Sequence, residues 1–217
     1  MKGDRIGAHV LCVRMIPNAD PMLLRALKLE KEYRSLGILT SDSDDVSYAA
    51  LDEATKKANV LVAYARSMYA GASNASTKYA GEFVGILAGF DPEEVRSGLD
   101  AAVDYIEHVA SFYSASDDDK VIYFAHCISS AGRYLSQIAG VREGTAMAYL
   151  IAPPLEAVVG LDAALKAAEV EMKVFYGPPS ETNFAGGLLT GEQAACKAAC
   201  EAFAKSVQDT AGNPLSY

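Results

Sequence analysis

The sequence predicts an α/β fold, an α+β sandwich built from two tandem domains, and two observations lead to this prediction. First, residues 50–60 (ALDEATKKANV) and 160–170 (GLDAALKAAEV) are identical at six of eleven positions, at an offset of 110 residues. Second, strand-like and helix-like segments follow in the same order in both halves of the chain. An internal repeat of this kind indicates two copies of one structural unit, so we predict domains over residues 1–110 and 111–217.

Strands are predicted where short apolar segments are rich in β-branched and aromatic residues. These segments cover residues 10–16, 36–40, 60–66 and 81–89 in the first copy, and 121–126, 148–152, 171–176 and 185–191 in the second. Helices separate the strands, and the economical arrangement packs them on one sheet. We therefore predict one small sandwich in each copy, with a ferredoxin-like mixed sheet.

Helices are predicted where apolar residues recur with helical spacing or where a helix start is recognisable. They cover residues 48–58, 91–109, 158–168 and 192–207, with a short helix after Asp20 and Pro21 and its counterpart in the second copy. Asp91 is suited to cap the second of these helices, and Pro92 suits its first turn. Glu93 and Glu94 follow at the positive end of the helix dipole.

The composition is that of a folded protein with a large core, with 51% apolar and 22% charged residues. A formal net charge of −9 would repel a phosphate backbone, so nucleic acid is not an expected partner. No apolar segment approaches the roughly 20 residues that cross a bilayer, and the first residues resemble no signal peptide. We therefore expect an intracellular protein that does not enter a membrane.

Neither a metal site nor a cofactor site is expected. Cys196 and Cys200 lie one helical turn apart in an alanine-rich segment without histidine, so small core residues explain them better than metal ligands do. The three histidines lie far apart in the sequence. The glycines of GILAG (85–89) and GLLTG (187–191) match no phosphate-binding pattern.

Several longer segments resemble one family. They are SLGILTSDSDDV (35–46), RSMYAGA (66–72), GEFVGILAGFDPEEV (81–95), AYLIAPPLEA (148–157), GPPSETNF (177–184) and LTGEQAACKAAC (189–200). Together they resemble the bacterial microcompartment shell proteins, specifically the tandem, circularly permuted shell proteins of ethanolamine utilisation. The resemblance covers nearly the whole chain and departs from the family mainly in residues 1–9 and 28–35.

This resemblance implies a structural protein and not an enzyme. It implies a homotrimer in which two domains per chain form a six-domain disc, and edge-to-edge packing with other shell proteins around enzymes that process ethanolamine. It also implies a gated central pore and a smaller pore within each subunit. A small-molecule-sensing tandem module that forms no shell is the alternative, followed by an enzyme that depends on carboxylates.

Acidic residues crowd the segment before the helix at 48–58. Asp42, Asp44 and Asp45 can simply cap that helix and favour its dipole. The resemblance implies a second role, in which Asp44, Asp45, Glu82 and the aromatic Phe112 bind ethanolamine in the subunit pore. Paired carboxylates can also act as acid and base, but no nucleophile or second catalytic partner is recognisable nearby.

Two loops are candidates for the central pore. Residues 67–79 (SMYAGASNASTKY) combine small residues with tyrosines, and residues 177–184 (GPPSETNF) are their shorter counterpart. A plain surface loop is the simpler explanation of each. The resemblance implies that they surround the pore, with side chains or a flexible backbone supplied by Tyr69, Gly71, Ala72, Ser73, Asn183 and Phe184.

Overall fold

A computed structural model describes residues 1–68 and 77–216 of the chain. Its residues form two compact units. The N-terminal unit comprises Gly7–Ala110 and Gly132–Leu135, and the C-terminal unit comprises Met1–Ile6, Ser111–Ala131 and Ser136–Tyr217. Each unit thus includes a short segment from the other half of the sequence. The division of the chain into two domains over residues 1–110 and 111–217 stays a prediction.

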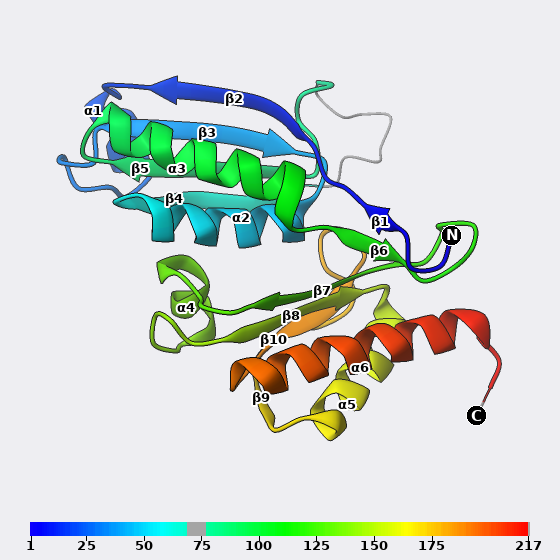
Figure 1. Ribbon diagram of the computed structural model, residues 1–217. Helices are drawn as coiled ribbons and strands as arrows, with labels where there is room; N and C mark the ends of the chain where they lie inside the picture. Colours follow the sequence, from blue (N-terminus) through cyan, green and yellow to red (C-terminus); the bar gives the residue numbers. More distant parts are fainter. Residues whose placement is uncertain (69–76, 217) are drawn as a thin grey trace. The chain divides into compact units, whose positions relative to one another are not determined.

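The N-terminal unit contains a four-stranded sheet in the order β2-β3-β5-β4. Its strands are β2 (Val10–Ile16), β3 (Ser35–Ser41), β4 (Val60–Ser67) and β5 (Phe83–Gly89). Its helices are α1 (Pro21–Ala26), α2 (Asp44–Lys57) and α3 (Pro92–Asp104), and α3 continues into a π-helical turn, Tyr105–Val109. Figure 1 shows α2 and α3 packed on one face of this sheet. Leu24 of α1 forms a small apolar cluster with Leu36 of β3 and Ala88 of β5.

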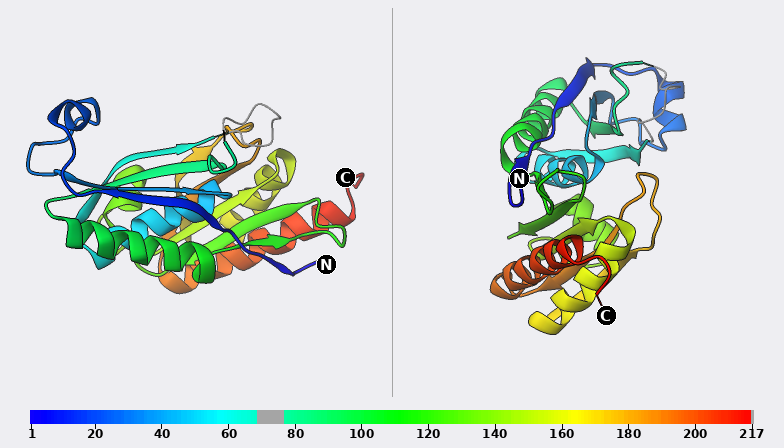
Figure 2. Two further views of the ribbon diagram at one scale, coloured as in Figure 1. Left: turned by 90° about the horizontal axis from the view of Figure 1, so that it is seen from above. Right: turned by 90° about the vertical axis from the view of Figure 1, so that its right-hand side faces the viewer.

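The C-terminal unit contains a six-stranded sheet in the order β1-β6-β7-β8-β10-β9. Its strands are β1 (Arg5–Ile6), β6 (Phe112–Ser114), β7 (Ile122–Ile128), β8 (Met147–Ala152), β9 (Val170–Tyr176) and β10 (Ala185–Gly191). Helix α4 (Arg133–Ala139) follows β7, and α5 (Pro154–Ala167) and α6 (Gln193–Gly212) lie side by side on one face of the sheet (Figure 2). The strands β1 and β6 were not predicted, because two or three residues are too few to display an alternating pattern.

The prediction of a mixed sheet was wrong in one respect, since every strand pairing among the described residues is antiparallel. In the N-terminal unit, α2 connects β3 to β4, and such a crossover returns the chain in the same direction. The two strands are not neighbours, however, because β5 lies between them and pairs with both. Insertion of this reversed strand makes the sheet antiparallel.

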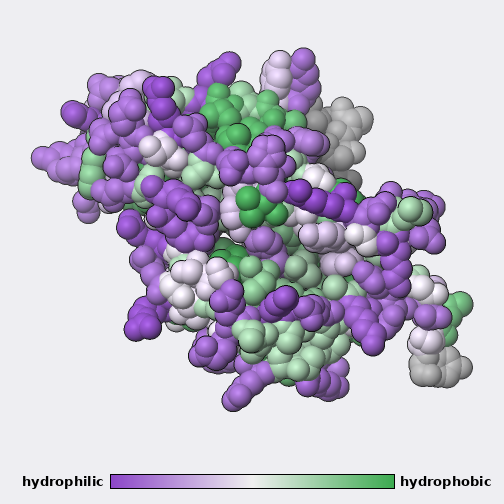
Figure 3. Space-filling model, in the orientation of Figure 1, coloured by the Kyte–Doolittle hydropathy of each residue, from purple (hydrophilic) through white to green (hydrophobic). Residues whose placement is uncertain are grey.

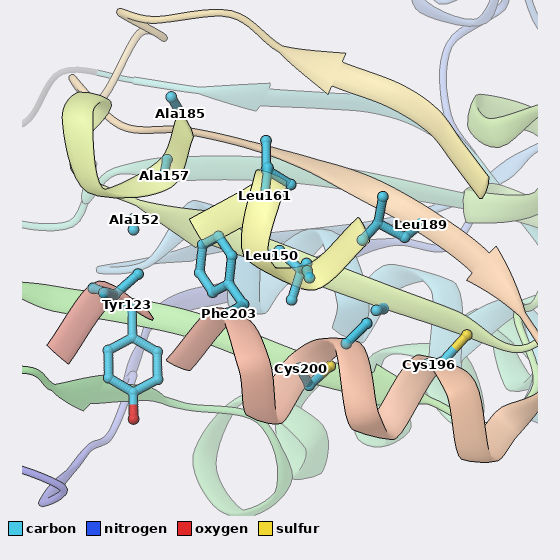
Figure 4. Packing of buried hydrophobic residues seen from close by; sticks show 14 of the residues in the cluster. Tyr123, Leu150, Ala152, Ala157, Leu161, Ala185, Leu189, Cys196, Cys200 and Phe203 are labelled. Atoms are coloured by element: carbon cyan, nitrogen blue, oxygen red, sulfur yellow. The ribbon is translucent and has the colours of Figure 1, made fainter. Parts of the chain in front are cut away.

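The core of the C-terminal unit lies between its sheet and the helices α5 and α6. Figure 4 shows Leu150 of β8 and Leu189 of β10 facing Leu161 of α5 and Phe203 of α6. Cys196 and Cys200 belong to the same buried cluster, which confirms that they are core residues. Among the described residues, no helix combines the length and apolar character that crossing a membrane requires.

The helix starts show which local signals were reliable. Asp91 Oδ1 accepts the backbone N–H groups of Glu93 and Glu94 at 2.9 and 3.0 Å, which confirms the predicted cap. Asp20 caps α1 in the same way, through the N–H of Met22 at 2.7 Å. In contrast, α2 and α5 both begin four residues before their predicted starts. Acidic residues and prolines in these first turns interrupt the apolar periodicity on which the prediction depended.

Candidate functional site

The candidate site forms where three elements of the N-terminal unit meet: the end of β3, the start of α2 and the start of β5. The N–H of Glu82 donates to the carbonyl of Ser41 at 2.8 Å. Gly81, directly before it, has a φ of +64°, and a Cβ there would lie 2.0 Å from the carbonyl oxygen of Ser41. Only glycine permits this approach, which brings Glu82 beside the acidic segment before α2.

Hydroxyl groups order the first turn of α2. The Ser47 hydroxyl donates to the carbonyl of Ser43 at 2.7 Å, and the hydroxyls of Ser41 and Ser47 lie 2.5 Å apart. Asp44 and Asp45 are both buried, and the N–H of Asp45 donates to Asp44 Oδ1 at 2.9 Å. The positive end of the α2 dipole stabilises two carboxylates in this position.

The pKa of the Glu82 carboxylate depends on its burial and on its acidic neighbours. Its partial burial, followed by the negative charges of Asp44 and Asp42, raises the pKa of Glu82 above its ordinary value. Asp42 itself is exposed, and its carboxylate accepts the backbone N–H of His9 at 2.6 Å. The structure therefore brings Glu82 and Asp44 within electrostatic reach of each other.

Tyr48 adds an aromatic side chain that the sequence analysis missed. Its hydroxyl lies 3.0 Å from Ser67 Oγ, and the edge of its ring packs against Phe83 at a centroid distance of 4.9 Å. Burial and the charges of Asp44 and Asp45 raise the pKa of Tyr48, so the phenol stays neutral. The available signal was its spacing, because residues three and four apart share one face of a helix.

Phe112 lies in the C-terminal unit, on β6. It is buried, with ring centroids 5.3 Å from Phe124 and 5.8 Å from Phe184. These contacts make Phe112 part of an aromatic cluster within its own unit. Its predicted role beside the carboxylates stays a prediction.

The predicted pore loops are described in part. Tyr69, Gly71, Ala72 and Ser73 lie outside the described residues. In the second loop, Ser180 exchanges hydrogen bonds with Phe184, donating its N–H to the Phe184 carbonyl at 2.9 Å and accepting the Phe184 N–H through Oγ at 3.2 Å. Asn183 occupies the left-handed region, with a φ of +63°, and completes this tight turn. The pore role of both loops stays a prediction.

A second residue missed by the sequence analysis is Asp52, whose side chain is fully buried. Its two carboxylate oxygens accept the backbone N–H groups of Gly132 at 2.7 Å and Leu135 at 2.9 Å. Thr55 Oγ1 accepts the N–H of Arg133 at 3.1 Å. Burial raises the pKa of Asp52, and the two donated hydrogen bonds oppose that shift. Nothing in the local sequence separates Asp52 from its repeat counterpart Asp162, so only the structure reveals this role.

The chemistry available at the site is the binding of a small cation. Within the part of the chain that the structure describes, no cluster of three or more histidine, cysteine or acidic residues has a geometry that would hold a metal ion. Carboxylates at hydrogen-bonding distance form charge-assisted contacts with an ammonium group.

Comparison with known proteins places the chain in a family. Residues 35–117 match the BMC domain family. The chain is 61% identical over 217 residues to the bacterial microcompartment shell protein EutL of Clostridium perfringens, covering all of both chains. It is 50% identical over 212 residues to EutL of Salmonella typhimurium, covering 98% of this chain and 97% of that one.

Solved structures agree with this assignment. The crystal structure of the ethanolamine utilization protein EutL from Leptotrichia buccalis superposes with a TM-score of 0.98 at 64% identity, covering 100% of each chain. The trimeric shell protein PduB shares the fold, with a TM-score of 0.76 at 23% identity over 94% of this chain and 89% of that one. The chain therefore belongs to the EutL family of bacterial microcompartment shell proteins.

Proposed function

We propose that this chain is a structural, non-enzymatic subunit of a bacterial microcompartment shell. In this role it forms a trimeric, pseudohexameric tile that packs edge to edge with other shell proteins in the bacterial cytoplasm. The observation that supports this most directly is the 61% identity to a EutL shell protein over the full length of both chains. The internal repeat adds a second argument, because three chains with two similar units each supply six units for one ring.

We extend the proposal to transport. A tile must let small metabolites pass while the shell stays intact, and the loops at residues 67–79 and 177–184 are the candidates for a gated central pore. The carboxylates of Asp44, Asp45 and Glu82 are the candidates for a subunit pore that binds protonated ethanolamine. A sensing module that forms no shell is not favoured, because the full-length relatives compared above are named shell proteins.

Assembly is tested by mass measurement and electron microscopy of the purified chain. We expect a trimer in solution and hexagonally packed sheets at higher concentration. A stable monomer, or a hexamer of full-length chains, would contradict the tile. Discrete small oligomers that never form sheets would instead support a sensing module.

The cation site is tested by titrating ethanolamine against the protein by NMR. We expect a dissociation constant of about 1 mM, or roughly 4 kcal/mol, since a ligand with two carbons buries little surface. Replacing Asp45 with Asn and Glu82 with Gln removes two charges and preserves the shape of both side chains. This double variant should show no saturable binding of ethanolamine. The matched control, Glu93→Gln with Asp100→Asn, removes two exposed charges from α3 in the same unit and should leave binding unchanged.

Equal losses in both double variants would mean that net charge, and not the site, attracts the ligand. Unchanged binding in the Asp45→Asn, Glu82→Gln variant would eliminate the site while leaving the shell role intact.

A further inference from the structure

Helices α2 and α5 occupy equivalent places in the repeat, yet one face is covered in α2 and bare in α5. At the 110-residue offset, Asp45, Tyr48, Ala49 and Asp52 correspond to Leu155, Val158, Val159 and Asp162. The four residues of α2 are buried or half-buried. The apolar residues of α5 at these positions are 62%, 47% and 45% exposed for Leu155, Val158 and Val159. In Figure 3 the surface over α5 and α6, low in the view, is pale green between purple hydrophilic residues.

The face of α2 is covered by residues Gly132–Leu135, which belong to the same compact unit. Three backbone N–H groups of this segment donate to Asp52 and Thr55. The rings of Tyr48 and Tyr134 stack at a centroid distance of 6.4 Å. At Gly132 the approach is so close that a Cβ would lie 2.6 Å from the Asp52 carbonyl oxygen. This contact is close and mostly polar.

The covering segment has its own counterpart in the repeat. At the 111-residue offset that aligns Leu24 with Leu135, the counterpart of Gly132–Leu135 is residues 21–24, the start of α1. Its two apolar side chains point into solvent, with Met22 72% and Leu23 41% exposed. The chain therefore carries a second helix face and a second covering segment, and both expose apolar side chains.

The two bare surfaces match each other chemically, position by position. In the existing contact, Tyr48 of α2 stacks on Tyr134 of the covering segment. The equivalent residues in the repeat are Val158 and Leu23. Where Thr55 accepts the backbone N–H of Arg133, the repeat places the half-buried Leu165 opposite Met22. Residues with hydroxyl or charged groups, Tyr48, Thr55, Arg133 and Tyr134, thus have apolar counterparts in the repeat. Such coordinated replacement favours burial of each surface against the other.

The residues that cap the starts of α4 and α1 also differ between the two copies. The start of α4 relies on the carboxylate of Asp52, whereas α1 is capped by its own Asp20. Asp162 is therefore not needed as a cap, and it forms an exposed ion pair with Lys166 at 2.7 Å. The missing contact needs no buried carboxylate, which suits an apolar surface.

We infer that the exposed α5 face, formed by Leu155, Val158 and Val159, binds the α1 start, residues 21–24, of a second copy of this chain. The inference rests on the proposed trimer and identifies the surface that holds it together. Each chain offers its α5 face to one neighbour and its α1 start to the other. This contact is head-to-tail, and such contacts close into a ring when the rotation allows.

The direct test joins the two surfaces covalently. Val158→Cys and Leu23→Cys in one chain, under mild oxidation, should give disulfide-linked dimers and trimers on a nonreducing gel, and the closed ring should stop at three chains. Leu23→Cys with Glu201→Cys, which moves the second cysteine to the exposed side of α6, is the matched control and should link no better than the native chain. The native chain, with its four free cysteines, gives the background.

A charge exchange provides the second test. Val158→Asp and Leu23→Arg should each raise the dissociation constant of the trimer at least about tenfold, because a charge is buried without a partner. The two together should restore most of the affinity. Leu215→Asp places the same charge on another exposed apolar residue and should have no effect. All three positions are exposed, so the unfolding temperature of the dilute protein should stay constant.

The outcomes separate this interface from the function on which it rests. A native trimer that neither links through Val158 and Leu23 nor responds to the charge variants overturns the interface and leaves the shell role standing. A native monomer overturns both. Linkage together with rescue by the charge pair supports both.

Discussion

The first turns of α2 and α5 occupy equivalent positions in the repeat but differ in chemistry. Helix α2 begins with the buried acids Asp44 and Asp45, and α5 begins with Pro154 and the exposed Leu155. Both starts suit a helix, because carboxylates favour the positive end of its dipole and proline fits the first turn. A helix in this place therefore does not require acids. For this reason we propose the buried carboxylates of α2 as part of a binding site.

The same comparison applies to a second pair of equivalent residues on these two helices. Asp52 and Asp162 are identical in the alignment, yet one is a buried acceptor of two backbone N–H groups and the other an exposed partner of Lys166. Identity in a repeat does not imply identity of role. The surroundings of a residue decide its role, and four experiments can test this conclusion.

The largest difference is expected at these two aspartates. Asp52→Ala leaves buried N–H groups of Gly132 and Leu135 without an acceptor, and should lower the free energy of unfolding by about 3 kcal/mol. Asp162→Ala removes only an exposed ion pair and should cost less than about 0.5 kcal/mol. Urea unfolding at one protein concentration measures both. Similar costs for the two variants would show that the Asp52 hydrogen bonds contribute little.

A second difference lies in how each helix packs. Gly160 of α5 corresponds to Ala50 of α2, and a Cβ at Gly160 would lie 2.7 Å from Cδ2 of the buried Phe203 ring. Gly160→Ala should therefore destabilise the protein by about 2 kcal/mol through overpacking. The reverse change, Ala50→Gly, should cost about 1 kcal/mol through backbone flexibility.

Thermal unfolding of each variant, and of Gly160→Ala combined with Phe203→Leu, measures these effects. If the ring is the obstacle, the double variant should lose less stability than the two single losses predict together. Strict additivity would exclude the ring as the cause.

A third test concerns pH at the acidic end of α2. Burial and the charges of Asp44 and Asp42 raise the pKa of Glu82, so this carboxylate gains its proton at a higher pH than an ordinary glutamate does. Only the ionised form attracts an ammonium ion, so ethanolamine affinity should fall about tenfold as pH decreases through this raised pKa. Glu82→Gln removes this titrating group and should therefore weaken the pH dependence of binding. The same profile in both proteins would assign the titration to another group.

The smallest effects are expected at the equivalent lysines. Lys166 pairs with Asp162 at 2.7 Å on an exposed helix surface, and Lys56 pairs with Glu53 at 2.5 Å in a half-buried position. Replacing either lysine with alanine should cost about 0.3 kcal/mol, and less at high salt. A larger cost for Lys166 in the assembled trimer than in the dilute monomer would place this residue at an interface.

Much of the local structure was predictable, because its causes are local. The apolar, β-branched composition of β2, the caps at Asp20 and Asp91 and the apolar residues of α6 are each visible within a short stretch of sequence. The starts of α2 and α5 were misplaced because their polar or proline-rich first turns conceal the periodicity. The strands β1 and β6 were missed because each becomes a strand only through pairing with residues far away in the sequence.

The candidate site was predictable in kind but not in arrangement. The crowding of Asp42, Asp44 and Asp45 was visible in the sequence, and the family resemblance suggested Glu82. What brings Glu82 to the start of α2 is the positive φ of Gly81 beside the carbonyl of Ser41. The contact between Tyr48 of α2 and Ser67 at the end of β4 likewise depends on tertiary structure, because the two residues lie on different elements.

The sequence by itself determined the repeat, the order of the elements and the residue types at every equivalent position, because periodicity and composition act over short distances. Only the tertiary structure decided which copy of each residue is covered. Asp52 and Asp162 stand in nearly the same local sequence, and the difference between them is whether a segment from elsewhere in the chain reaches that helix face. Burial is a property of the folded chain, so desolvation, the pKa shift of Asp52 and the bare apolar face of α5 became visible only in three dimensions.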